Sequence, residues 1–126
     1  MSILKKLRMK KEDIRVYEKL LPQLSVMQKE FTELSKKKPD DHLNLFKLGL
    51  INQLLEEANK LIGDMKPFAS FDTFKEEEMP SNSDAVLILS QYVSALSRFK
   101  KENTVTKTVT PSFEFENTEE FWKTED

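Results

Sequence analysis

The segment LNLFKLGLINQLLEEANKLI, residues 43–62, decides the fold class of this chain. Its apolar residues recur at intervals of three and four, the spacing that gathers side chains on one face of an α-helix. A second apolar row lies beside the first, so the apolar face is wide enough to contact more than one neighbour. We therefore expect a central helix that is capped by Asp40 or Asp41 and ends where Gly63 adopts a left-handed conformation.

Two further amphipathic segments flank this central helix. In residues 14–34 the apolar side chains follow the helical period, but Pro22 interrupts them. Proline lacks the N–H that an interior helical position donates, so we expect a break or kink near Leu21. A third helical pattern follows Ser81 and Asp84, whose spacing is that of a capping box. The chain is thus expected to be mainly α, a bundle of about four helices with a C-terminal extended or β segment.

The C-terminal segment follows a different period. After Asn103 the apolar residues alternate with threonines, which predicts an extended chain. Pro111 lacks a donor for strand pairing, so the segment is an edge strand, a short hairpin bent near Pro111, or an unpaired extended tail. Asn117 is expected to cap a last helical turn that carries Phe121 and Trp122.

The chain has the length of a single domain, because 126 residues with 38% apolar content can bury one core. We expect residues 1–103 to form the helical bundle and residues 104–126 to form the extended segment, packed on the bundle or on a partner. The formal net charge is only −2, but it is unevenly distributed. The first eleven residues carry five cations, and residues 112–126 carry six carboxylates and one lysine. This separation of positive and negative charge between the two ends of the chain serves recognition or, more simply, solubility and helix-end electrostatics.

Residue types that carry catalysis are scarce. The chain has no cysteine, which excludes disulfides, thiolate nucleophiles and cysteine-ligated metals. Its two glycines, Gly49 and Gly63, fit neither a phosphate-binding loop nor a dinucleotide-binding motif. The single histidine, His42, has Pro39 three residues before it instead of a glutamate, so a di-iron site is excluded. We expect no enzymatic activity, with no catalytic, cofactor-binding or metal-binding residue and no small-molecule substrate.

The sequence also bears on location. The longest apolar run, residues 85–89, is too short to span a bilayer, and the first residues lack the apolar core of a signal peptide. We therefore expect a cytoplasmic protein.

A phenylalanine-rich loop separates the second and third helical patterns. Between residues 64 and 80 the helical period lapses, yet Phe68, Phe71 and Phe74 recur every three residues. One interpretation is a lid whose rings close one end of the bundle. The other is an exposed aromatic patch onto which a partner docks.

The functional hypothesis is a non-enzymatic protein–protein interaction module, either an adaptor or a subunit of a complex, including a homodimer. A lone strand cannot satisfy its own hydrogen bonds, which favours strand addition to a partner or to a second copy. Large aromatic anchors would dominate such a contact. The candidate partner-binding residues are Phe113, Phe115, Phe121 and Trp122 in the C-terminal segment, and Phe68, Phe71 and Phe74 in the loop.

The alternative hypothesis is a peripheral adaptor that binds an anionic membrane or a nucleic acid through the basic N-terminus. Apolar residues in this stretch alternate with cations, so a helix there would have one apolar side and a basic surround. A simpler interpretation is that these residues form the first turns of the first helix. The candidate anion-binding residues are Lys5, Lys6, Arg8, Lys10 and Lys11.

Overall fold

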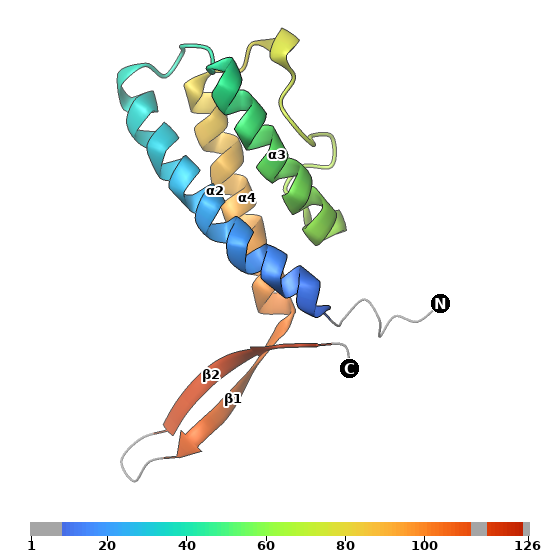
Figure 1. Cartoon of the computed structure of the whole chain (residues 1–126). Helices are drawn as coiled ribbons and strands as arrows, with labels where there is room; N and C mark the ends of the chain where they lie inside the picture. The colour runs from blue at the N-terminus through green and yellow to red at the C-terminus, as the bar shows by residue number, and fades with distance from the viewer. Residues whose placement is uncertain (1–8, 112–115, 125–126) are drawn as a thin grey trace.

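A computed structural model describes residues 9–111 and 116–124, and it confirms the mainly α-helical class. Three helices lie side by side, and a β-hairpin extends from one end of the bundle (Figure 1). The elements in chain order are α2 (Lys11–Lys37), α3 (Leu45–Ile62), the 3-10 turns η1 (Gly63–Met65) and η2 (Glu76–Glu78), α4 (Asn82–Glu102), β1 (Thr104–Pro111) and β2 (Glu116–Trp122).

The predicted break in the first amphipathic segment is wrong. α2 continues through Pro22, which lies on the exposed side of the helix. Leu20 and Leu24, on either side of this proline, are 1% and 0% exposed. Burying two leucines contributes about 3–6 kcal/mol, which offsets the roughly 3 kcal/mol that a proline costs inside a helix. With α2 unbroken, the part of the chain that the structure describes contains three helices instead of about four.

The start of α3 is set by Asn44, and neither Asp40 nor Asp41 caps it. The Asn44 side-chain oxygen accepts hydrogen bonds from the backbone N–H groups of Phe46 (2.8 Å) and Lys47 (3.3 Å). Asparagine and aspartate are about equally good helix caps, so local preference does not choose among these positions. The path of the connection from α2 to α3 makes the choice.

Both ends of the loop between α3 and α4 follow the sequence closely. Gly63 ends α3 with a positive φ of 53°, as expected, although its ψ of −120° lies outside the left-handed helical region. The capping box of α4 is confirmed, because the Asp84 N–H donates to Ser81 Oγ (3.2 Å) and the Ser81 N–H donates to Asp84 Oδ2 (2.8 Å). The Asn82 side chain donates to the Lys38 carbonyl (2.8 Å), which ties the start of α4 to the end of α2.

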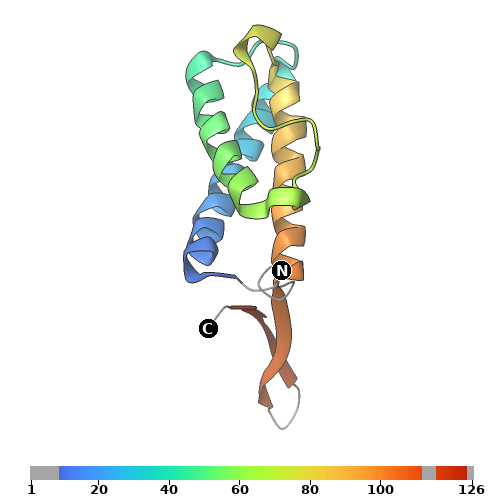
Figure 2. The same ribbon diagram turned by 90° about the vertical axis from the view of Figure 1, so that its right-hand side faces the viewer.

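The core lies between the three helices. α2 and α4 make the most extensive contact, and α3 packs against both (Figures 1 and 2). α3 therefore contacts two neighbours as predicted, but it is not the central helix. Part of its wide apolar face stays uncovered, since Phe46 is 73% exposed and Leu50 37% exposed. The fully buried large side chains are Leu20, Leu24, Phe31, Ile51, Leu55, Leu89, Tyr92 and Leu96.

The C-terminal segment is a hairpin. β1 and β2 pair antiparallel, from Thr104 opposite Trp122 at the helix end to Pro111 opposite Glu116 at the far end. Of the three alternatives that the sequence left open, the hairpin bent near Pro111 is the one found. The helical turn predicted at Asn117 is wrong, because this residue lies within β2. A paired strand satisfies the backbone of these residues, which a single helical turn does only in part.

Candidate functional site

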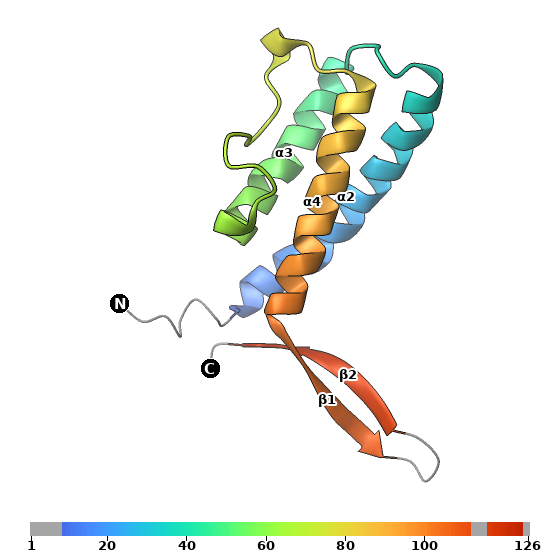
Figure 3. The same cartoon turned by 180° about the vertical axis from the view of Figure 1, so that it is seen from behind.

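The hairpin extends away from the helical bundle. Figures 1 and 3 show it leaving the end of α4 and pointing away from all three helices. Its two strands contact each other along their length, whereas contacts with the helices are confined to the end near Thr104 and Trp122, which we call the hairpin root. The rest of the hairpin is therefore an arm beyond the core.

Backbone hydrogen bonds hold the hairpin root to the start of α2 and to the end of α4. The Lys123 N–H donates to the Asn103 carbonyl (2.7 Å), and the Lys123 carbonyl accepts from the Met9 N–H (2.6 Å). Met9 is only 4% exposed, so the residue that precedes α2 by two positions is part of the core. The Lys123 ammonium also donates to the Glu102 carbonyl (3.0 Å) at the end of α4. These bonds fix the direction of the arm.

Trp122 anchors the hairpin root on the bundle of its own chain. Its ring meets the ring of Tyr17 edge to face, with centroids 5.0 Å apart. The Lys100 ammonium lies 5.8 Å from the Trp122 ring centroid, within the range of a cation–π contact. Tyr17 is 3% exposed, so Trp122 extends the α2–α4 core toward the hairpin.

Phe121 lies on the other face of the hairpin. It pairs across the strands with Val105, and both side chains are 37% exposed. Successive strand residues point to opposite faces, so this pair faces away from the one formed by Thr104 and Trp122. The outer face of the hairpin root therefore presents two adjacent apolar side chains, one aromatic and one β-branched.

The phenylalanine-rich loop is a strap along α3 and α4, as Figure 2 shows, and it does not close one end of the bundle. Phe74 is 9% exposed, and Phe71 packs edge to face against Phe74 with centroids 5.3 Å apart. The Asn52 side chain bonds both the N–H and the carbonyl of Phe74, each at 2.9 Å. Phe68 is 38% exposed. Phe71 and Phe74 therefore pack on the bundle, as the lid interpretation expected of these rings, but along its side and not over one end, while Phe68 is the ring that the loop presents to solvent.

A buried tyrosine fixes α4 to α3 beneath this strap. The Tyr92 hydroxyl donates to Asn59 Oδ1 at 2.6 Å, and the Asn59 amide donates to the Asp72 carbonyl in the strap at 2.9 Å. Burial raises the pKa of Tyr92 above its ordinary value of 10.0. The bond with Asn59 acts in the opposite direction, and the negative charge of Asp72 adds to the rise.

The raised pKa of Tyr92 predicts a loss of stability in alkaline solution. The folded chain holds the phenol proton more tightly than the unfolded chain, so the free energy of unfolding should fall as pH rises above about 10. Tyr92→Phe should remove this part of the fall and cost about 1 kcal/mol at neutral pH, since it deletes a hydrogen bond. Urea unfolding followed by circular dichroism at several pH values measures both effects. An alkaline slope unchanged by Tyr92→Phe would contradict the expectation.

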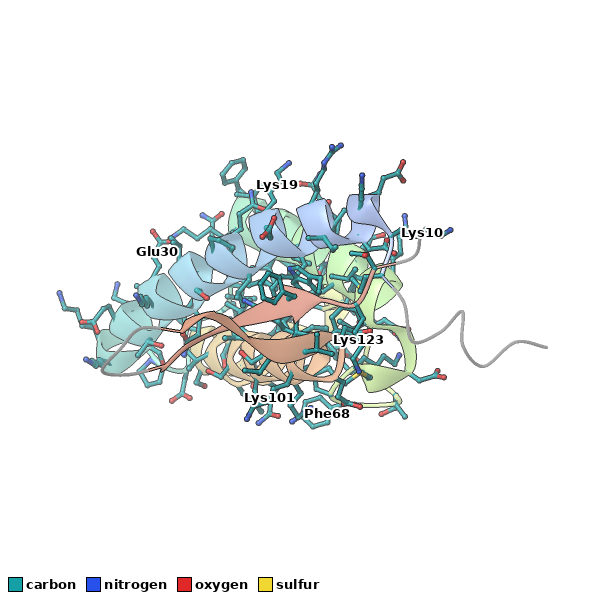
Figure 4. The ribbon with its side chains drawn as sticks, turned by 90° about the horizontal axis from the view of Figure 1, so that it is seen from below. Lys10, Lys19, Glu30, Phe68, Lys101 and Lys123 are labelled. Carbon is teal, nitrogen blue, oxygen red and sulfur yellow. The ribbon has the colours of Figure 1, made fainter. Side chains whose placement is uncertain are left out.

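Several predicted site residues fall outside the described residues, namely Phe113, Phe115, Lys5, Lys6 and Arg8. Of the predicted basic residues, Lys10 and Lys11 are described and exposed. Figure 4 shows Lys10 and Lys123 at the hairpin end of the molecule. The structure thus brings the start of α2 to the hairpin root. Sequence reasoning missed Met9, Tyr17 and Asn103 as parts of this root, because only the fold brings them together.

His42 is exposed, and no group of three or more His, Asp or Glu side chains in the described ranges could hold a metal ion. No helix among residues 9–111 and 116–124 has both the length and the apolar character to cross a bilayer. Comparisons with protein-family models, with curated proteins and with solved structures found no match for this chain.

Proposed function

We propose that this chain is a non-enzymatic protein–protein interaction module that presents its β1–β2 hairpin to another polypeptide. The observation that carries the proposal is the position of the hairpin, which extends beyond the bundle while its root is fixed by Trp122 and Lys123. A fixed root reduces the conformational entropy that is lost on binding, because the arm is already oriented before a partner binds.

The mode of binding that suits this arm is strand addition. A two-stranded sheet has two edges whose N–H and carbonyl groups can pair with a further strand. An isolated hairpin is marginally stable in water, and three or more strands are the usual minimum for independent stability. A partner strand would therefore stabilise the arm and gain backbone hydrogen bonds for itself.

Side chains at the hairpin root supply the apolar part of the contact. Phe121 and Val105 lie next to each other on the outer face, where an added strand and its neighbours can cover them. Aromatic residues near the centre of an interface commonly contribute the largest share of the binding energy. Trp122, in contrast, serves the interaction indirectly, since it holds the root on Tyr17.

The test uses the unsubstituted chain and two serine variants, each in turn, as bait in extracts of the native source. Phe121→Ser should weaken capture of the bound protein about thirtyfold, as loss of a binding hot spot would. Leu87→Ser is the matched control, because Leu87 is a 55% exposed apolar residue on α4. Quantitative mass spectrometry compares the captured amounts. If Phe121→Ser and Leu87→Ser captured equal amounts of the bound protein, the hairpin would be excluded as the contact surface.

A second candidate function, the binding of anionic surfaces, is favoured by one contact. The bond between Met9 and Lys123 places the start of α2, with Lys10 and Lys11 exposed, at the same end as Lys123 (Figure 4). Such a cluster attracts phosphate groups, and the attraction falls steeply with salt. Sedimentation with phosphatidylserine vesicles and with duplex DNA at low salt tests it. Absence of binding to both would reject this candidate.

A further inference from the structure

A basic groove lies between α2 and α4, directly beside the hairpin root. Tyr17 and Lys100 line this groove and also contact Trp122, so groove and root are continuous. Figure 4 looks onto this end of the molecule, where the hairpin crosses in front of the helices and Lys101 extends from α4. The groove has a volume of about 470 Å³ and is lined by Tyr17, Leu21, Ser94, Ser97, Arg98, Lys100 and Lys101.

The groove carries positive charge without an internal counter-charge. Arg98, Lys100 and Lys101 stand within four residues on α4, and no carboxylate is among the lining residues. The ion pairs seen among the described side chains, Lys36 with Glu33 and Lys66 with Asp72, involve none of these three cations. Like charges at this spacing repel one another, and an anionic ligand would relieve the repulsion. The two serine hydroxyls, the aromatic ring of Tyr17 and the apolar side chain of Leu21 suit a peptide rather than a bare ion.

The chain itself contains a segment of opposite charge. β2 has the sequence ENTEEFW, with three glutamates and no cation, and residues 112–126 together carry six carboxylates and one lysine. β2 forms one strand of the arm, and the basic groove lies at the base of the same arm. Arm and groove are thus complementary, and a pair of chains can satisfy both at once.

We propose that the basic groove binds the acidic hairpin of a second copy of this chain, so that two copies exchange arms in a symmetric dimer. The inference rests on the proposed function, because it takes the hairpin as the contact element and names its partner. A two-fold axis gives each copy one arm to donate and one groove to fill, which closes the assembly at two chains.

Antiparallel pairing of the two arms brings the charges together. β1 has eight residues, which at about 3.3 Å per residue make an arm about 26 Å long. If Thr104 of one copy lies opposite Pro111 of the other, the far end of each arm lies at the root of its partner. Glu116 pairs with Pro111 at that far end, so in this register its position in the strand comes to the root of the other copy, beside the basic groove. Pro111 then occupies the end of the new ladder, where its missing N–H costs least.

The sequence of the strands selects β1 as the edge that meets the second copy. Pairing β2 with its own twin would bring glutamates of the two copies together, and like charges on facing strands destabilise a sheet. β1 has the sequence TVTKTVTP, whose single charge is Lys107. In the register above, Lys107 lies opposite Thr108 of the second copy, so no like charges face each other.

Charge reversal in both elements tests the dimer. Sedimentation equilibrium of the full chain should show a dimer that weakens between about 50 mM and about 500 mM NaCl. The double variant Arg98→Glu, Lys101→Glu should raise the dimer dissociation constant by at least about tenfold, and so should Glu116→Lys. Combining the three substitutions should restore the dimer. Lys29→Glu, at an exposed position elsewhere on α2, is the control and should change nothing.

The possible outcomes separate this inference from the proposed function. A chain that stays monomeric at low salt overturns the dimer, while loss of a captured protein in Phe121→Ser would still support the hairpin as a contact surface. A dimer that survives both reversals but is lost in Phe46→Ser would lie on the uncovered face of α3, which also overturns the inference. Rescue by the combined variant supports it, because misfolding of either variant could not be reversed by adding the substitutions of the other.

Discussion

Leu24→Ala is expected to lower the free energy of unfolding by about 3–4 kcal/mol. Leu24 lies on α2, is 0% exposed and belongs to the core shared with α4, so the substitution leaves a cavity that the neighbouring helices cannot fill. The substitution also tests the continuity of α2, because the burial of Leu24 helps to offset the cost of Pro22 within the helix. Urea unfolding followed by far-ultraviolet circular dichroism measures the change.

Val26→Ala is the matched control for this prediction. Val26 stands two residues further along the same helix but is 65% exposed, so its truncation should change stability by less than about 0.5 kcal/mol. The contrast tests which side of α2 faces the core. Equal losses in Leu24→Ala and Val26→Ala would mean that α2 is rotated relative to the structure described above.

Trp122→Ala is expected to release the hairpin from the bundle, at a cost of about 2–3 kcal/mol in the opening free energy of the arm. The ring contact with Tyr17 accounts for about 0.5–1.5 kcal/mol beyond the buried area, and the contact with Lys100 for about 0.5–1 kcal/mol. Hydrogen exchange should therefore accelerate at the amides of β1 and β2, while the amides of α3 keep their protection.

The control for Trp122→Ala comes from the adjacent residue of the same strand. Phe121 is 37% exposed on the outer face, so Phe121→Ala should change hairpin exchange by less than about 1 kcal/mol. The chain has a single tryptophan, so the fluorescence of every other variant reports on the root alone. If Phe121→Ala opened the hairpin as much as Trp122→Ala, the assignment of the two faces would be wrong.

Parts of the fold could be predicted where neighbouring residues decide the outcome. The capping box formed by Ser81 and Asp84 needs only residues three apart, and it begins α4 where expected. The apolar spacing of the three amphipathic segments likewise identified each helix, because side-chain burial on one face requires that period. The positive φ at Gly63 follows from the absence of a side chain at that position.

Other parts were mispredicted because local preference is weak against packing. Pro22 predicts a break when taken alone, and the burial of Leu20 and Leu24 overrides it. Asn117 predicts a helical cap when taken alone, and pairing with β1 makes it part of a strand. The candidate site shows the same limit, since Phe121 and Trp122 have similar sequence surroundings but lie on opposite faces of the hairpin.

The sequence by itself determined the mainly helical class, the approximate positions of the helices and the change to extended structure after Asn103, because these depend on residues close together in the chain. Only the tertiary structure decided that α2 is unbroken, that the last strands form a hairpin and that Met9, Tyr17 and Trp122 meet at its root. The reason is that burial energy belongs to contacts between distant segments, and these contacts exist only once the helices have packed.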